Sequence, residues 1–212
     1  GACPTVEAPP GFVYSSGVPV HLVDHPLVQD ILLSLRDQRT EPDSFRRMAV
    51  RISVLLATEA LRMLPVRPDT VRTPLADAHG VRVATNVVVV PVLRAGLGML
   101  DAVLELVPGA RVGHIGLQRD ETTAIASRYY TKLPPGLADS YVLLIDPMLA
   151  TGGSAVEALD LLKQAGARRI QILCIVAAPE GIDLVTRHHP DVDIFTPVVD
   201  ERLNDKKYIV PG

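Results

Sequence analysis

The chain has 212 residues, of which 48% are hydrophobic and 21% charged, and its formal net charge is −3. This composition excludes a disordered chain, and the slightly acidic charge argues against broad binding to nucleic-acid phosphates. No signal peptide is evident and no run approaches the roughly 18–20 apolar residues of a membrane span, so we expect a soluble, cytoplasmic protein with no membrane or nucleic-acid partner.

The first part of the chain predicts an extended arm, a short strand, two helices and a hairpin. The arm covers residues 1–19 and is rich in proline. Apolar spacing and proline start signals predict an edge strand at 18–23, helices at 26–37 and 40–64, and hairpin strands at 71–75 and 80–83. The expected buried stripes of the helices are Leu27, Ile31 and Leu35 in the first, and Phe45, Met48, Ile52, Leu55, Leu56 and Met63 in the second.

From residue 87 onward, apolar strands alternate with helices, the pattern of an open parallel sheet. Strands are predicted at 87–93, 111–117, 129–131, 141–145, 170–176 and 193–199, and helices at 97–107, after residue 152, and at 179–189. The polar stretch in 119–134 predicts a flexible arm. We find no repeat or linker, so we expect one α/β domain over residues 1–212. Cys3 and Cys174 lie in a tail and a core strand, so no disulfide is expected.

The chemistry is expected in the loop DPMLATGGS, residues 146–154, between a buried strand and a helix. Gly152 and Gly153 let successive N–H groups point at one spot, and a helix N-terminus there favours an anion such as phosphate. The alternative is a plain turn in which Ser154 and Glu157 form a capping box. Asp146 favours the first interpretation, because a carboxylate beside an anion site suits a ligand with phosphate and hydroxyls. Its own alternative is an Asx turn at Asp-Pro.

Two arginines follow neighbouring strands at their carboxyl ends. Arg94 comes directly after the 87–93 strand, and Arg119 begins the polar arm. A guanidinium there can hold phosphate oxygens through paired hydrogen bonds. The residues alone slightly favour a surface arginine at Arg94, and favour a loop arginine paired with Asp120 or Glu121 at Arg119. The histidines match no metal-ligand pattern, and His188 and His189 are expected to be solvated at a helix end.

The run DPMLATGGS resembles the phosphoribosyl-diphosphate loop of type I phosphoribosyltransferases, in the form of the uracil phosphoribosyltransferase family. There proline stands where many relatives carry a second acidic residue. Further stretches resemble that family in order and spacing: 20–37, 90–120, 129–134 and 200–212. The resemblance covers most of the chain. It implies a type I phosphoribosyltransferase-like fold, an open twisted parallel sheet flanked by helices, with a β-arm and a C-terminal base-binding hood at 193–212.

The resemblance also implies roles for particular residues. Phosphoribosyl diphosphate (PRPP) is expected to contact Arg94, Arg119, Asp146, Pro147, Met148, Leu149, Ala150, Thr151, Gly152, Gly153 and Ser154. Arg119 and Asp146 are the expected catalytic residues. Mg²⁺ is expected to be held mainly by the substrate's diphosphate, with no dedicated metal ligand on the protein. A homodimer or homotetramer and a GTP effector are further expectations from the family.

Uracil is expected to pair with backbone groups of Tyr208, Ile209 and Gly212 in the hood. Relatives continue past this point with a short segment rich in glycine and aspartate. We expect the natural protein to carry that segment beyond Gly212, which an intact mass would test. The implied function is uracil phosphoribosyltransferase activity in pyrimidine salvage. The alternatives are the same transfer to another base, a nucleotide-sensing or RNA-binding regulator, and a catalytically silent homologue.

Overall fold

The computed structural model describes residues 12–13, 19–119 and 126–212. Its main element is a nine-stranded sheet in which all neighbours from β2 to β7 run parallel, while β1 and β8 pair antiparallel at the two ends. The strand order is β1 (Phe12–Val13), β2 (Pro19–Leu22), β13 (Asp193–Thr196), β11 (Arg169–Leu173), β9 (Ser140–Ile145), β5 (Asn86–Leu93), β7 (His114–Arg119) and β8 (Ala126–Lys132), with β6 (Arg111–Val112) also beside β5.

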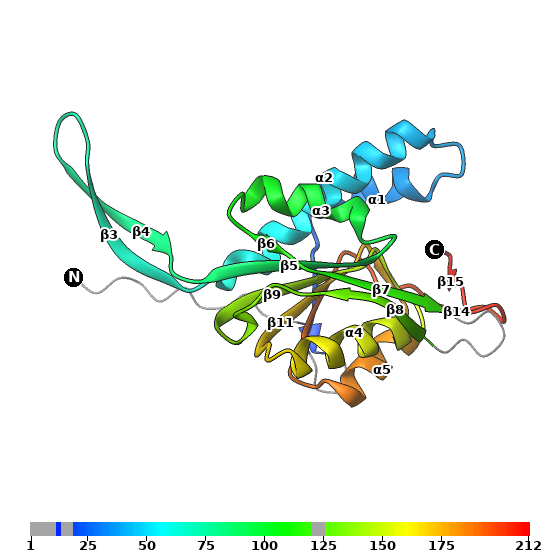
Figure 1. Cartoon of the computed structure of the whole chain (residues 1–212). Coiled ribbons are helices and arrows are strands. Elements are labelled where there is room, and N and C mark those ends of the chain that lie inside the picture. The colour runs from blue at the N-terminus through cyan, green and yellow to red at the C-terminus, as the bar shows by residue number, and fades with distance from the viewer. Residues whose placement is uncertain (1–11, 14–18, 120–125) are drawn as a thin grey trace.

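Helices cover both faces of the sheet (Figure 1). One face carries α1 (Pro26–Arg36), α2 (Pro42–Ala60) and α3 (Leu97–Leu106), and the other α4 (Gly153–Gln164) and α5 (Pro179–His188). Because side chains alternate along a strand, the central strands contribute side chains to two separate cores, one on each face of the sheet. Val142 and Leu144 of β9 belong to the core under α4, whereas Leu143 and Ile145 belong to the core under α2 and α3. The predicted parallel sheet flanked by helices is confirmed.

The buried stripes predicted for the first two helices need correction. In α1 the buried residues are Val28, Ile31 and Leu32, and Leu27 is 54% exposed, because the face that meets the core is turned one residue further along the helix. The α2 helix ends at Ala60 and a 3₁₀ turn (Leu61–Met63) follows, so Met63 leaves the stripe and is exposed.

Two strands also lie differently from the prediction. The strand at 19–22 is not an edge strand, because β1 pairs with its outer side. The strand predicted at 111–117 is interrupted at Gly113 and continues as β7 to Arg119. The predicted hairpin forms, but its turn lies at 73–76 instead of 76–79. Its strands, β3 (Val66–Arg72) and β4 (Asp77–Val83), are longer than expected and project from the body of the protein (Figure 1). The tip of the predicted arm at 119–134 lies outside the described residues, as do most residues of the predicted 1–19 arm.

Small strand pairs complete the fold beside the carboxyl ends of the central strands. β10 (Met148–Leu149) pairs in parallel with β12 (Val176–Ala177), and β14 (Arg202–Leu203) pairs antiparallel with β15 (Ile209–Val210). His189, expected in solvent, is instead buried, because the chain packs it against α4 where its Nε2 lies 3.5 Å from Asp160 Oδ1. None of the described helices is long and apolar enough to cross a membrane.

Candidate functional site

The predicted PRPP-contacting residues gather at the carboxyl ends of β5, β9 and β7, with Arg94, Asp146 and Arg119 at these three ends. Parallel pairing places the ends of neighbouring strands at the same side of the sheet, which is where ligands of open α/β folds bind. Arg119 is the last residue of β7, and its side chain lies outside the described part of the chain.

The loop after β9 leaves a row of backbone donors without partners. Gly152 has φ +83° and caps α4, which begins at Gly153 with no side-chain cap, so the alternative capping box of Ser154 and Glu157 does not form. Among the described residues, the N–H groups of residues 151–154 donate to no carbonyl, and the hydroxyls of Thr151 and Ser154 have no hydrogen-bond partner. Such donors at a helix N-terminus form an anion site.

Backbone contact with α5 fixes the shape of this loop. A Cβ on Gly152 would lie 2.7 Å from the Gly181 carbonyl oxygen, and a Cβ on Gly181 would lie 2.5 Å from the Ala150 carbonyl oxygen. Two glycines therefore face each other where the loop crosses the first turn of α5. Gly181 is not among the residues predicted for the site; a glycine in the first turn of a helix, where other residues have better propensity, was the available signal.

Within the loop, the residues after Asp146 divide by environment. Pro147 and Met148 border a cavity, and the Pro147 carbonyl accepts from the N–H groups of Ile175 and Val176 at 2.9 and 3.1 Å. The Leu149 side chain is buried in the core, so only its backbone can face a ligand, and the Leu149 carbonyl accepts from the Ala178 N–H at 2.9 Å. These contacts tie the loop to β12.

Asp146, at the end of β9, is half-buried and has few partners among the described residues. Its Oδ1 lies 3.5 Å from the Met148 N–H, which is the Asx-turn contact of the alternative interpretation, at a long distance for a hydrogen bond. Desolvation raises the pKa of this carboxyl to about 7. A carboxyl whose pKa lies near 7, placed at the carboxyl end of the sheet, is typical of a functional site. A cation bound nearby would lower that pKa and ionise the group.

A cavity of about 620 Å³ opens beside Arg94; polar and apolar groups contribute equally to its lining, and we call it the polar cavity to distinguish it from the neighbouring apolar one. Leu93, Ala95, Leu117, Gln118 and Tyr129 complete its described lining, which brings together the ends of β5 and β7 with β8. The Arg94 side chain is exposed to this space. Gln118 and Tyr129 were not predicted; Gln118 is a polar residue beside Arg119 at the end of an apolar strand, the same signal that identified the arginine.

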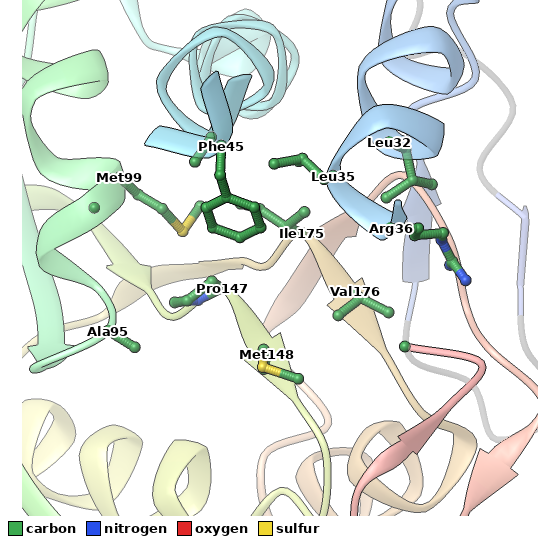
Figure 2. Close-up of a pocket in the computed structure, with 13 residues that line it drawn as sticks. Leu32, Leu35, Arg36, Phe45, Ala95, Met99, Pro147, Met148, Ile175 and Val176 are labelled. Atoms are coloured by element: carbon green, nitrogen blue, oxygen red, sulfur yellow. The ribbon is translucent and has the colours of Figure 1, made fainter. Parts of the chain in front are cut away.

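A second cavity, of about 430 Å³, lies on the other side of Ala95 and is almost entirely apolar. Figure 2 shows side chains of the helices above it, including Phe45 and Met99, and Pro147 and Met148 of the loop below it. Phe45 was predicted to be core but faces this space. Of the described residues that line the cavity, only Arg36 is charged. Gly212 lies at its border, so the cavity reaches the C-terminal hood.

The predicted uracil-binding residues differ in what their backbone groups do. Tyr208 is 64% exposed and its N–H and carbonyl both bond to Asn204, at 2.9 and 2.8 Å. Ile209 packs its side chain with Val176 and Ala178, against Ala150 of the loop. The Gly212 N–H donates to Asp200 Oδ2 at 3.0 Å.

The register of the hood hairpin leaves Ile209 with outward-facing backbone groups. Ile209 pairs with Leu203, between the pair Asn204–Tyr208 and the pair Arg202–Val210. Bonded and non-bonded pairs alternate in an antiparallel ladder. The Leu203 N–H turns outward accordingly, to Glu180 Oε1 at 3.0 Å. The backbone of Ile209 therefore faces away from β14, although the residue as a whole is only 5% exposed.

The described residues contain no group of three His, Cys, Asp or Glu side chains placed to hold a metal ion. The site thus combines unpaired N–H donors, a carboxyl, a guanidinium, a polar cavity and an apolar cavity beside the hood.

Comparison with known proteins gives the family. The family model described as uracil phosphoribosyltransferase matches residues 22–212. The chain belongs to the uracil phosphoribosyltransferase family. It is 49% identical to the uracil phosphoribosyltransferase of Bacillus licheniformis over 91% of this chain and 93% of the relative, and 50% identical to that of Thermus thermophilus over the same shares.

Solved structures agree with the fold. A protein of Aquifex aeolicus aligns with a TM-score of 0.87 and 36% identity, over 91% of this chain and 93% of that one. A hypoxanthine-guanine phosphoribosyltransferase of Bacillus anthracis aligns with a TM-score of 0.51 and 11% identity, over 75% of this chain and 80% of that one. The second likeness concerns the fold alone.

Proposed function

We propose that this protein is a pentosyltransferase of pyrimidine salvage, which transfers the ribose 5-phosphate group of PRPP to uracil and yields uridine monophosphate (UMP) and diphosphate. The observation that carries the proposal is the row of unpartnered N–H groups at residues 151–154, at the carboxyl end of the sheet, between a polar and an apolar cavity. The family membership supports the same transfer.

The 5-phosphate of PRPP binds in this proposal to the N–H groups of residues 151–154 and to the hydroxyls of Thr151 and Ser154. The backbone of residues 147–150 forms the side of the loop that faces the sugar. The diphosphate lies in the polar cavity against Arg94, with Arg119 reaching it from the end of β7. Two guanidiniums fit this role, because each can place paired N–H donors on phosphate oxygens.

The reaction breaks the bond between the anomeric carbon and the diphosphate oxygen and forms a bond from that carbon to uracil N1, whose proton passes to the leaving diphosphate or to water. Positive charge grows on the sugar ring while negative charge grows on the leaving group. Arg94 and Arg119 stabilise the negative charge, and Asp146 holds the ribose hydroxyls and stabilises the cationic ring. The raised pKa of Asp146, about 7 in the free protein, falls when positive charge develops beside it.

When bound, Mg²⁺ would neutralise charge on the leaving diphosphate. The lone carboxyl of Asp146 is the protein group that would help to hold it. Residues 146–154 offer no second carboxylate, so most ligands come from the substrate.

Uracil occupies the space between the hood and the loop, where the backbone of Ile209 reads its edge and Met148 and the apolar cavity lie beneath it. Gly212 borders the same cavity, and Tyr208 contributes through the hairpin that holds Ile209. Backbone pairing rejects cytosine, because the wrong exocyclic group leaves a buried donor or acceptor unmatched.

The remaining expectations stay predictions: a homodimer or homotetramer, a GTP effector and a cytoplasmic location. No specific observation favours the rival functions, which are transfer to another base, an RNA-binding regulator and a silent homologue.

The test is Mg²⁺-dependent release of diphosphate from PRPP, measured with uracil and, in parallel, with cytosine, orotate, hypoxanthine and adenine. Of these five bases, we expect only uracil to give release of diphosphate. Release with another base and none with uracil would overturn the substrate assignment. RNA retention on filters at several salt concentrations tests the regulator, for which we expect no binding.

A further inference from the structure

Asp200 is a buried carboxylate that joins two distant segments beside the hood. The residue is 6% exposed. Its Oδ1 accepts from Arg36 Nη2 at 2.6 Å, and its Oδ2 accepts from the Gly212 N–H at 3.0 Å. Arg36 belongs to the last turn of α1, and Gly212 follows β15. One side chain thus connects a helix near the start of the chain to the end of the hood.

The backbone around Asp200 holds this carboxylate in a fixed place. Its N–H donates to the Ala177 carbonyl at 2.8 Å, and the next N–H, of Glu201, donates to the Val210 carbonyl at 3.1 Å. The first of these bonds attaches Asp200, just before the hairpin, to β12, the strand that also pairs with the loop of the candidate site. A change in its side chain would therefore affect the contact with Gly212 while the backbone bond to β12 stays in place.

The segment that Asp200 holds is the one next to the proposed base-reading group. Gly212 has φ +84°, and a Cβ on it would lie 2.8 Å from the Ile209 carbonyl oxygen, so the backbone of Gly212 folds back onto Ile209. Arg36 and Gly212 both border the apolar cavity, and Figure 2 shows Arg36 on the α1 side of it. The ion pair lies at the border between the cavity and the hood.

Burial makes the contact with Arg36 necessary for this arrangement. An ionised carboxylate out of water is costly unless it is paired and hydrogen-bonded. The Arg36 side chain is 20% exposed and that of Asp200 is 4% exposed, so water replaces little of the contact if either partner is removed. Without Arg36, the carboxylate would be expected to turn toward solvent and to release the Gly212 N–H.

We propose that Asp200, oriented by Arg36, is a positioning residue for the pyrimidine: it fixes Gly212 against Ile209 and so sets the place of the base-reading backbone. This rests on the proposed function. The alternative is a purely structural ion pair that stabilises the fold equally with or without a base.

The test compares Asp200→Asn with wild type in the full chain. Isothermal titration with UMP and with ribose 5-phosphate separates the base from the phosphate. We expect Asp200→Asn to weaken UMP binding about tenfold and to change ribose 5-phosphate binding less than about twofold. In kinetics, KM for uracil rises while KM for PRPP stays the same. Glu201→Gln, which removes the neighbouring exposed carboxylate paired with Arg202, is the matched control and keeps wild-type values.

Two further variants guard against misfolding and against a merely structural role. Arg36→Lys keeps a positive charge and is expected to retain most UMP affinity. Arg36→Gln removes the charge and is expected to weaken UMP binding as Asp200→Asn does. The double variant Arg36→Gln/Asp200→Asn leaves no unpaired buried charge, and its effect on UMP should be smaller than the sum of the single effects.

A lower melting temperature with unchanged UMP affinity would overturn the proposal and leave the structural ion pair. Equal losses of UMP and ribose 5-phosphate affinity would overturn it as well. If wild type binds ribose 5-phosphate but not UMP, and releases no diphosphate with uracil, the proposed function itself fails, and the two failures are distinct.

Discussion

The loop between β9 and α4 and the hairpin β14–β15 both belong to the candidate site, but different forces hold them. The loop leaves a strand that is buried along its whole length, and its backbone bonds directly to β12. The hairpin is mostly exposed, and the side chains of Glu180 and Asp200 hold its ends. Its ion pair joins residues 164 positions apart.

This difference matches the two tasks that we propose. Phosphate binding needs backbone donors in one rigid geometry, which a glycine-rich turn at the end of a buried strand supplies. Base binding needs a segment that can admit and cover a planar ring, and side-chain contacts at the border of a cavity allow that. Perturbing the loop should therefore affect phosphate binding and folding, and perturbing the hairpin should affect the base.

The largest expected effect is on turnover, from Arg94→Ala. This exposed guanidinium lines the polar cavity but packs in neither core, so its loss should lower kcat/KM for PRPP by about 10²–10³-fold with little change in melting temperature. Steady-state kinetics and a thermal melt check it. Arg46→Ala removes an exposed arginine on α2 that lines neither cavity, and should leave both values unchanged.

Gly152→Ala should cost the most stability. The residue has φ +83°, and a Cβ would lie 2.7 Å from the Gly181 carbonyl oxygen, so we expect a loss of roughly 2–4 kcal/mol in the free energy of unfolding. Urea titration measures it. The matched variant Gly153→Ala has ordinary φ, and its Cβ would meet no atom closer than Thr151 Oγ1 at 4.0 Å, so it should keep wild-type stability. Equal stability of the two variants would contradict the close contact with α5.

Asp146→Asn should change how the stability of the protein depends on pH. Burial raises the pKa of Asp146 to about 7, so the folded protein loses stability as the pH rises through that value, whereas the unfolded chain ionises near its ordinary pKa. Asparagine has no proton to lose. The free energy of unfolding of the variant should therefore exceed that of wild type by roughly 1–3 kcal/mol at pH 8, and this difference should fade toward pH 4.

Activity should move the other way in the same variant. If Asp146 stabilises the cationic ring as a carboxylate, most of the turnover is lost while phosphate binding remains. Near-normal turnover, or a stability difference that does not change with pH, would contradict the role assigned to this residue.

The smallest effect is expected from Glu180→Gln, at the other end of the hood. The Glu180 carboxylate is exposed and accepts from the Leu203 N–H at 3.0 Å, and the amide oxygen of glutamine can still accept that bond. We expect KM for uracil to rise about twofold to fivefold with KM for PRPP unchanged. A change in PRPP binding instead would show that the hairpin and the loop are not independent.

The sequence predicted the loop better than the hairpin, for a physical reason. The strand at 141–145, the glycines and the following helix are local signals, and the structure has all of them at those positions. The alternative capping box does not form, because Gly152 rather than Ser154 caps the helix. The contact between Asp200 and Arg36, and that between Gly152 and Gly181, depend on how distant segments pack, and spacing along the chain does not carry that information.

Helix faces show the same limit. The stripe of α1 was displaced by one residue, and Phe45 was assigned to a core although it faces a cavity. Periodicity identifies that a helix is amphipathic, but the direction of its buried face depends on its neighbours.

The central claim is that the N–H groups of residues 151–154 bind the sugar phosphate. Titration of the ¹⁵N-labelled protein with ribose 5-phosphate, followed through its amide resonances, tests this most directly. We expect the largest shifts on the amides of Thr151, Gly152, Gly153 and Ser154, and no such shifts with ribose. Saturable binding that leaves these four amides unmoved would contradict it.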